Sequence, residues 1–277
     1  MNRPIIHQTS FAVAKTAAPI LNTASFESIF SGSALPLDKQ GLLRAVETVV
    51  FPGTKMEILE KYSPHIFRVR IPQDYPYGDK LYIDRRFLKK ANGSTPERPL
   101  RLPSPNIILK RLEKLLGQRY IWGGNVLGVP ELAAFYPPDK PLDQLDPLTH
   151  DTWHLQGVDC SGLIYLATNG ATPRNTSGLV TFGEPVPIAN LSCAEIILKL
   201  KPLDAIVWKG HVVFVLNTTQ TIESRAGFGV IAANLYQRLI EIMQERKPAN
   251  EWNQSIVREN AFVVRRWHPE MVIKNVC

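Results

Sequence analysis

The sequence of 277 residues has no long apolar run and only three cysteines. No apolar stretch approaches the roughly 18–20 residues of a membrane-spanning helix, so we expect no transmembrane segment. The cysteines stand at positions 160, 193 and 277, and this spacing matches neither a disulfide framework nor a zinc site. We therefore expect no bound metal and no cofactor. A single cysteine can still act by itself, because a nucleophilic thiol needs no partner cysteine.

The sequence is also short of acidic residues in its N-terminal part. Residues 1–103 hold 15 lysines and arginines against 9 aspartates and glutamates, within a net charge of +7 for the whole chain. This surplus either favours an anionic polymer or membrane surface or belongs to a solvated face. No nucleic-acid-binding motif accompanies it, so we expect no nucleic acid partner. Phe11–Ala14 is too short for the core of a signal peptide and Lys15 interrupts it, so export by that route is not supported.

The length of the chain predicts two domains. Residues 1–40 mix Ala, Ser, Thr and Pro and predict a partly ordered lead-in. Residues 41–95 contain short β-rich runs separated by turns, and Ile66–Ile71 alternates apolar and basic residues as a half-buried strand does. Such a series predicts a small antiparallel barrel, and its pattern resembles a bacterial SH3-like domain. Residues 96–104 predict a linker.

Residues 105–277 predict a second domain of the α+β class, in which helices come before a run of antiparallel strands. Ser104 and Pro105 begin the first helix, and Gly117 ends it. Further elements are predicted as helices at 160–167 and 235–243 and as strands at 204–208, 211–216, 221–224 and 261–267. Between them, residues 125–156 are rich in Pro and Asp and have little periodicity. A connection of this length is typical of a functional lid.

The stretch Gly157–Ala167 carries the most informative cysteine. Its sequence predicts a loop that turns into a buried helix with Cys160 in the first turn, capped by Asp159 or Ser161. Asn169 and Gly170 then end the helix. A thiol at the start of a helix feels the positive end of the dipole, which favours the thiolate, the nucleophilic form. The alternative is a small buried cysteine with a packing role, the role that we also expect for the cysteine at position 193.

A base and its orienting group are predicted on two neighbouring strands. A cysteine nucleophile needs a base to take its proton, and the base needs a group that orients it. His211 and Glu223 lie twelve residues apart across a turn, so a hairpin would bring them together with Glu223 against one imidazole nitrogen. Taken singly, His211 can equally be a strand-end histidine without a role, and Glu223 an exposed carboxylate.

Together these motifs resemble the NlpC/P60 family of cysteine peptidases. Their order along the chain is that of the family, from about residue 105 to about residue 270. The matching segments are Tyr120–Gly124 (Tyr-x-Trp-Gly-Gly), Asp159–Leu163 (Asp-Cys-Ser-Gly), Pro173-Arg174, Leu200–Asp204, His211-Val212 and Glu223.

The resemblance implies a papain-like catalytic domain that cleaves amide bonds in the stem peptides of peptidoglycan, between D-glutamate and a diamino acid. It implies that Cys160 is the nucleophile, His211 the base and Glu223 the orienting group. Substrate-binding positions that it implies are Tyr120, Asp159 and Ser161, the last two placed for the free amine of the peptide. It also implies the cell envelope or periplasm as the location, while the weak signal for export leaves the cytoplasm open.

The sequence departs from the family pattern at several positions. Val213 and Leu203 stand where the family usually has glycine, Glu223 replaces the more usual His, Asn or Gln, and the stretch before Asp159 is longer than usual. These departures bear on substrate choice. Two other functions stay open: acyl transfer on the same fold, and an inactive module that binds cell-wall peptides.

Overall fold

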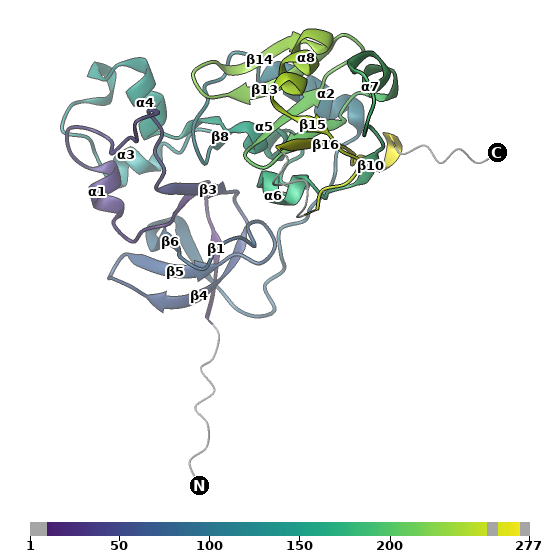
Figure 1. Cartoon of the computed structure of the whole chain (residues 1–277). Coiled ribbons are helices and arrows are strands. Elements are labelled where there is room, and N and C mark those ends of the chain that lie inside the picture. The colour runs from purple at the N-terminus through teal and green to yellow at the C-terminus, as the bar shows by residue number, and fades with distance from the viewer. Residues whose placement is uncertain (1–9, 254–259, 272–277) are drawn as a thin grey trace. The chain divides into compact units, whose positions relative to one another are not determined.

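The computed structural model describes residues 10–253 and 260–271, so the cysteine at position 277 lies outside the described residues (Figure 1). The chain forms two compact units. The first takes Met1–Pro99 and Trp122–Gln156, and the second takes Leu100–Ile121 and Gly157–Cys277. Both units are therefore discontinuous in sequence, and the fold as a whole is a mixture of α-helices and large antiparallel sheets.

The first unit is built on a seven-stranded sheet in which every pairing is antiparallel and the strand order is β3-β2-β6-β5-β4-β1-β7. Its strands are β1 (Ser10–Ala14), β2 (Ala18–Leu21), β3 (Val46–Val50), β4 (Lys55–Lys61), β5 (Ile66–Arg70), β6 (Leu81–Asp84) and β7 (Leu88–Ala91). Around it lie β8 (Asn125–Leu127), the helices α1 (Phe26–Phe30), α3 (Glu131–Phe135) and α4 (Pro147–Trp153), and the 3₁₀ turns η1 (Arg85–Phe87) and η2 (Leu142–Gln144).

The sheet begins earlier in the chain than the sequence predicts. Residues 1–40 were expected as a partly ordered lead-in, yet β1 and β2 come from this segment and both lie inside the sheet. β1 pairs with β4 and β7, and β2 pairs with β3 and β6. Their buried residues include several alanines, which lack the β-branched side chains that signal a strand, so the pattern was missed. The expected start of this domain at residue 41 is corrected accordingly.

Residues 122–156 belong to the first unit, which corrects the expected single run of 105–277 for the second domain. Gly123 has a φ of +70°, and a Cβ there would come within 2.6 Å of the Val46 side chain. The Asn125 side chain accepts a hydrogen bond from Val49 N at 2.9 Å and donates one to Val49 O at 2.8 Å. Trp153 is fully buried. This stretch is thus anchored on β3 by a few residues at irregular spacing, which explains its lack of periodicity.

The second unit is built on a six-stranded antiparallel sheet of order β10-β16-β11-β12-β13-β14. Its strands are β10 (Glu184–Val186), β11 (Ala205–Trp208), β12 (His211–Val215), β13 (Gln220–Arg225), β14 (Gly229–Asn234) and β16 (Ala261–Arg266), and the short β15 (Lys247–Pro248) pairs with β16 in parallel. The helices are α2 (Pro105–Lys114), α5 (Cys160–Ala167), α6 (Thr176–Leu179), α7 (Cys193–Lys199) and α8 (Leu235–Glu245). β9 (Gln156–Val158) precedes α5, and η3 (Pro269–Met271) follows β16.

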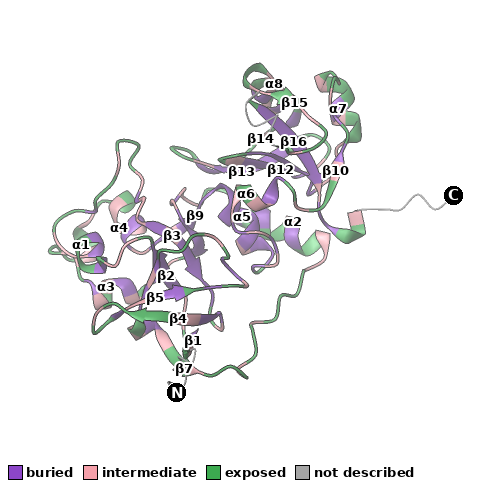
Figure 2. Cartoon of the chain, turned by 60° about the horizontal axis from the view of Figure 1, so that its bottom comes forward, coloured by how far each residue is buried: buried purple, intermediate pink, exposed green. Residues whose placement is uncertain are grey.

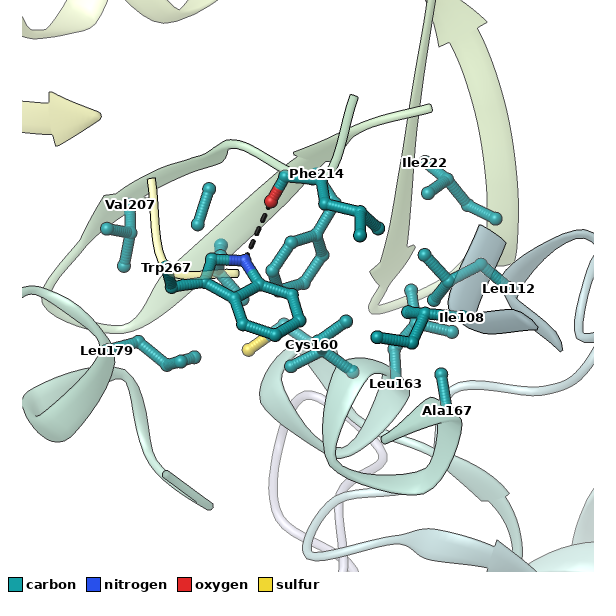
Figure 3. Packing of buried hydrophobic residues seen from close by; sticks show 14 of the residues in the cluster. Ile108, Leu112, Cys160, Leu163, Ala167, Leu179, Val207, Phe214, Ile222 and Trp267 are labelled. Atoms are coloured by element: carbon teal, nitrogen blue, oxygen red, sulfur yellow. Dashed lines mark hydrogen bonds between the residues drawn. The ribbon is translucent and has the colours of Figure 1, made fainter. Parts of the chain in front are cut away.

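Apolar clusters cover both faces of this sheet, and the strands are buried accordingly (Figure 2). Val212 and Phe214 of β12 pack in a cluster with residues of α2 and α5, part of which Figure 3 shows. Val213 and Val215 pack in the other cluster, with residues of α7 and α8. Alternate residues of one strand therefore belong to opposite faces, as the two-residue period of a strand requires. Val213, which stands where glycine was expected, is a fully buried core residue on the α8 side.

Candidate active site

The local structure around Cys160 is the one that the sequence predicts. Cys160 is the first residue of α5, and Asp159 caps the helix by accepting a hydrogen bond from Gly162 N at 2.6 Å. Asn169 and Gly170, just after the helix, have φ values of 56° and 78°. These left-handed residues end the helix, since Asn and Gly adopt that conformation at low cost. The thiol is therefore held at a defined end of a buried helix.

The thiol lies against the turn that carries the histidine. Cys160 Sγ is 3.9 Å from the main-chain O of Gly210, the residue directly before His211. Gly210 joins β11 to β12 with a φ of +102°, and its N–H donates to Thr176 Oγ1 at 3.1 Å. In Figure 3 Cys160 lies beside Trp267 in the apolar cluster. The turn between β11 and β12 therefore contacts the start of α5.

Burial governs the protonation of this thiol. Cys160 is only 7% exposed, and burial raises the pKa of the thiol to about 12, with the nearby Asp159 charge adding to the rise and Arg174 opposing it. The expectation that the helix start would favour the thiolate at rest is therefore corrected. A dipole at a helix end offsets part of the cost of burying a charge, and here the cost of burial is larger. At rest the Cys160 thiol is therefore protonated.

Asp159 is engaged by an arginine as well as by the helix. Arg174 Nη2 donates to Asp159 Oδ2 at 2.7 Å, and Arg174 Nη1 donates to Asp159 Oδ1 and to Ser161 Oγ, each at 3.0 Å. The Arg174 side chain is 1% exposed. Asp159 and Ser161 are thus brought together as predicted, around a buried cation that the sequence analysis recognised only as part of a Pro-Arg pair. The negative charge of Asp159 is compensated within the protein.

His211 and Glu223 meet across the predicted pair of strands. β12 and β13 pair antiparallel, and His211 Nε2 lies 2.6 Å from Glu223 Oε2. A carboxylate accepts, so this contact makes Nε2 the protonated nitrogen and leaves Nδ1 as the other ring position. The Glu223 side chain is 1% exposed, which differs from the exposed carboxylate of the alternative interpretation. The predicted base and orienting group are therefore in hydrogen-bond contact.

An arginine that the sequence analysis missed holds Glu223 from the other side. Arg238 Nε donates to Glu223 Oε1 at 2.6 Å and Arg238 Nη2 donates to Oε2 at 3.1 Å. Burial by itself would raise the pKa of Glu223, but hydrogen bonds from His211 and Arg238 outweigh burial and hold it below the ordinary value. A signal existed in the sequence: Arg238 falls three residues after Leu235 and four before Ile242, on the apolar stripe of α8.

Tyr120 follows a segment that lies next to the start of α5. Arg119 O accepts from Val158 N at 3.1 Å, two residues before Cys160. Tyr120 itself is half-buried and belongs to the second unit. Its part in a substrate site stays a prediction, as do the catalytic roles of the other residues.

Two further features of the described residues concern metal binding and membrane spans. Among the described residues, no group of three or more His, Cys, Asp and Glu side chains is arranged to hold a metal ion. Within residues 10–253 and 260–271, no helix has both the length and the apolar character needed to cross a membrane.

Comparison with known proteins identifies similar solved structures but no similar sequence. No family model and no curated protein matches the chain. An NlpC/P60 family protein from Bacillus cereus is 16% identical with a TM-score of 0.36, and the match covers 95% of this chain and 64% of that one. NlpC1 from Trichomonas vaginalis is 15% identical with a TM-score of 0.34, over 94% and 69% of the two chains. The P60 domain of an antigen from M. avium paratuberculosis is 15% identical with a TM-score of 0.34, over 59% and 93%.

These structures are of the family that the motifs predict. Their identities and TM-scores are too low to support residue roles or a reaction, and this chain spans less than two thirds of the Bacillus cereus protein.

Proposed function

We propose that this chain is a cysteine peptidase that hydrolyses an amide bond in peptidoglycan stem peptides, between D-glutamate and a diamino acid. The observation that carries the proposal is the placement of Cys160 Sγ against Gly210, beside a histidine whose Nε2 bonds to a buried carboxylate. The nature of the substrate and of the scissile bond rests on the resemblance of the motifs to the NlpC/P60 family.

The protonation state of the Cys160 thiol before attack decides how the proposed reaction begins. The thiol is neutral, because burial raises the pKa of Cys160 to about 12. As Sγ attacks the carbonyl carbon, Nδ1 of His211 takes the thiol proton, and Glu223 stabilises the imidazolium that forms. The main-chain N–H of Cys160 donates to the oxygen on which negative charge develops. His211 then protonates the leaving amine, which leaves an acyl group on Cys160.

Water completes the cycle. His211, again neutral, takes a proton from a water molecule that attacks the thioester carbonyl, and the proton returns to Sγ as the C–S bond breaks. The products are the peptide carboxylic acid and the free thiol. No step needs a cofactor.

Tyr120, Asp159 and Ser161 are proposed to hold the amino-terminal side of the substrate. The amine of a trimmed peptide would approach Asp159 Oδ2, which already accepts from Arg174 at 2.7 Å. Because Arg174 compensates the carboxylate, we expect the free amine to be preferred by a smaller factor than an unpaired carboxylate would produce. The first unit is proposed to be an SH3-like accessory domain, and the cell envelope is the proposed location.

An inactive peptide-binding module is the second candidate, and one observation favours it. Burial makes the Cys160 thiol harder to ionise, which is typical of a structural cysteine. Acyl transfer in place of hydrolysis is a further outcome of the same experiment, since both reactions share the acyl-enzyme.

The experiment is digestion of two stem peptides that differ only in acetylation of the amino terminus, with products identified by mass spectrometry. A peptidase releases a new amine at the glutamyl bond, and a modest preference for the free peptide supports the role of Asp159. Cys193→Ala serves as the matched control, because this thiol belongs to α7 and lies 3.9 Å from the main-chain O of Tyr236. Transfer of the acyl group to an added amine in place of water would indicate a transferase. Tight binding of both peptides without a product would indicate a binding module.

A further inference from the structure

We infer that Arg238 is a positioning residue for the proposed reaction: it fixes Glu223 in one orientation against His211 and offsets the charge of its carboxylate. The inference rests on the proposed function for its kinetic consequences. Its electrostatic consequence, a change in when His211 takes up a proton, needs no turnover.

The geometry leaves Glu223 little freedom. The two nitrogens of the Arg238 fork contact both carboxylate oxygens, at 2.6 Å and 3.1 Å, while His211 contacts Oε2 at 2.6 Å. A planar guanidinium that binds both oxygens fixes the plane of the carboxylate as well as its position. Lysine, a single point charge, would supply the charge without the fork.

The helix in turn holds the arginine. Arg238 Nη1 donates to Glu241 Oε2 at 2.8 Å, and the Arg238 side chain is 11% exposed. Leu235 and Leu239, on either side of it along α8, are buried in the cluster that α8 shares with the sheet. Figure 1 shows α8 alongside β13 and β14. The Arg238 guanidinium is therefore held against Glu223 by a helix that packs on the sheet.

Several groups face the imidazole, and their charges set its proton affinity. Glu223 comes from β13 and Arg238 from α8, and on β11 the Trp208 ring lies 5.3 Å from the His211 ring. Arg246, just after α8, lies over the Trp208 ring, 4.7 Å from its centroid. The Cys160 thiol, from α5, is neutral. The strongest local charges are thus one carboxylate and the arginine bound directly to it.

A buried carboxylate with no other cation would bind the imidazolium form of His211 tightly. That form cannot accept the thiol proton, so a histidine locked as imidazolium is a poor base. Arg238 shares the negative charge of Glu223 and repels a proton on His211, so its removal favours protonation of the imidazole. Glutamate can therefore stand where the family pattern more often has His, Asn or Gln, because the arginine offsets its charge.

The test is a double-mutant cycle of Arg238→Met and Glu223→Gln, read by the pH profile of kcat/KM and by the NMR titration of the His211 imidazole. For Arg238→Met we expect the acidic limb and the imidazole titration to move to higher pH by about one unit, and kcat/KM to fall about tenfold at pH values below the limb. Adding Arg238→Met to Glu223→Gln should cost less than about twofold, because a neutral amide has no charge to offset. Arg238→Lys should restore the position of the acidic limb but only part of the rate.

Arg266→Met is the matched control, since it removes an arginine that binds both oxygens of another buried carboxylate, Asp204, and not Glu223. It should move the acidic limb by less than about 0.3 unit. The inference is overturned if Arg238→Met lowers stability yet leaves the imidazole titration where it was, or if it costs the same factor with Glu223 and with Gln at position 223. Either result would make Arg238 a purely structural contact. Because the NMR titration is independent of turnover, a chain that cleaves no amide would contradict the proposed function and still test this inference.

Discussion

At neutral pH the Cys160 thiol is expected to react with an alkylating reagent about 1,000-fold more slowly than a thiol of ordinary pKa. The reason is the fraction of thiolate: burial raises the pKa of Cys160 from 9.0 to about 12, and each unit lowers the thiolate fraction tenfold at a pH below both values. The difference corresponds to about 4 kcal/mol against ionisation. Only a base placed to take the proton in the transition state would make such a thiol an efficient nucleophile.

The assay is the rate of iodoacetamide labelling at Cys160 between pH 6 and pH 10, measured by mass spectrometry of the peptide that contains it. Labelling at Cys193 in the same sample controls for decay of the reagent. The rate at Cys160 should rise about tenfold per pH unit with no plateau at low pH. A plateau below pH 7 that disappears in His211→Ala would refute the reasoning, because it would show that thiolate and imidazolium already exist as a pair at rest.

Three further outcomes follow from the contacts. Arg174→Met should lower the free energy of unfolding in urea by about 3–5 kcal/mol, because it leaves Asp159 as a buried charge without its partner. Adding Asp159→Asn should recover part of this loss, and a loss below about 1 kcal/mol would contradict the pairing. Gly123→Ala should lower the thermal midpoint clearly more than Gly41→Ala, because both glycines have a positive φ but only at Gly123 would a Cβ meet neighbouring atoms. Equal effects would argue against the close approach of Gly123 to Val46. Between pH 9 and pH 12 the wild-type protein should lose up to about 1.4 kcal/mol of stability per pH unit relative to Cys160→Ala, because the unfolded thiol ionises first while the folded one stays protonated. If the free energies of unfolding of the two proteins changed in parallel with pH, that result would contradict the raised pKa of Cys160.

The sequence predicts best where a local rule and a pattern agree. The helix that begins at Cys160 could be predicted because an apolar run follows a capping Asp and precedes Asn169-Gly170. The contact between His211 and Glu223 could be predicted because a short turn joins two β-rich runs, which then pair. Each of these inferences depends on residues close together in the chain.

Features that depend on distant residues could not be predicted in this way. The place of 122–156 in the first unit depends on the contact of Asn125 with Val49, which no periodic signal announces. The contact of Arg238 with Glu223 joins a helix to a strand, and no pairing rule relates these two elements as a hairpin relates His211 to Glu223. The protonation of Cys160 depends on how much of the fold surrounds it, and a rule about helix ends does not include that cost.

The proposed function requires that Cys160 forms a covalent acyl-enzyme and passes its proton to His211. The most direct measurement is kcat/KM for cleavage of a free stem peptide by the wild-type protein, Cys160→Ala, His211→Ala and the double variant, with circular dichroism to verify that each is folded. We expect each single variant to lose at least about 1,000-fold and the double variant to lose little more, because the two residues act as a unit. Normal cleavage by folded Cys160→Ala would contradict the claim.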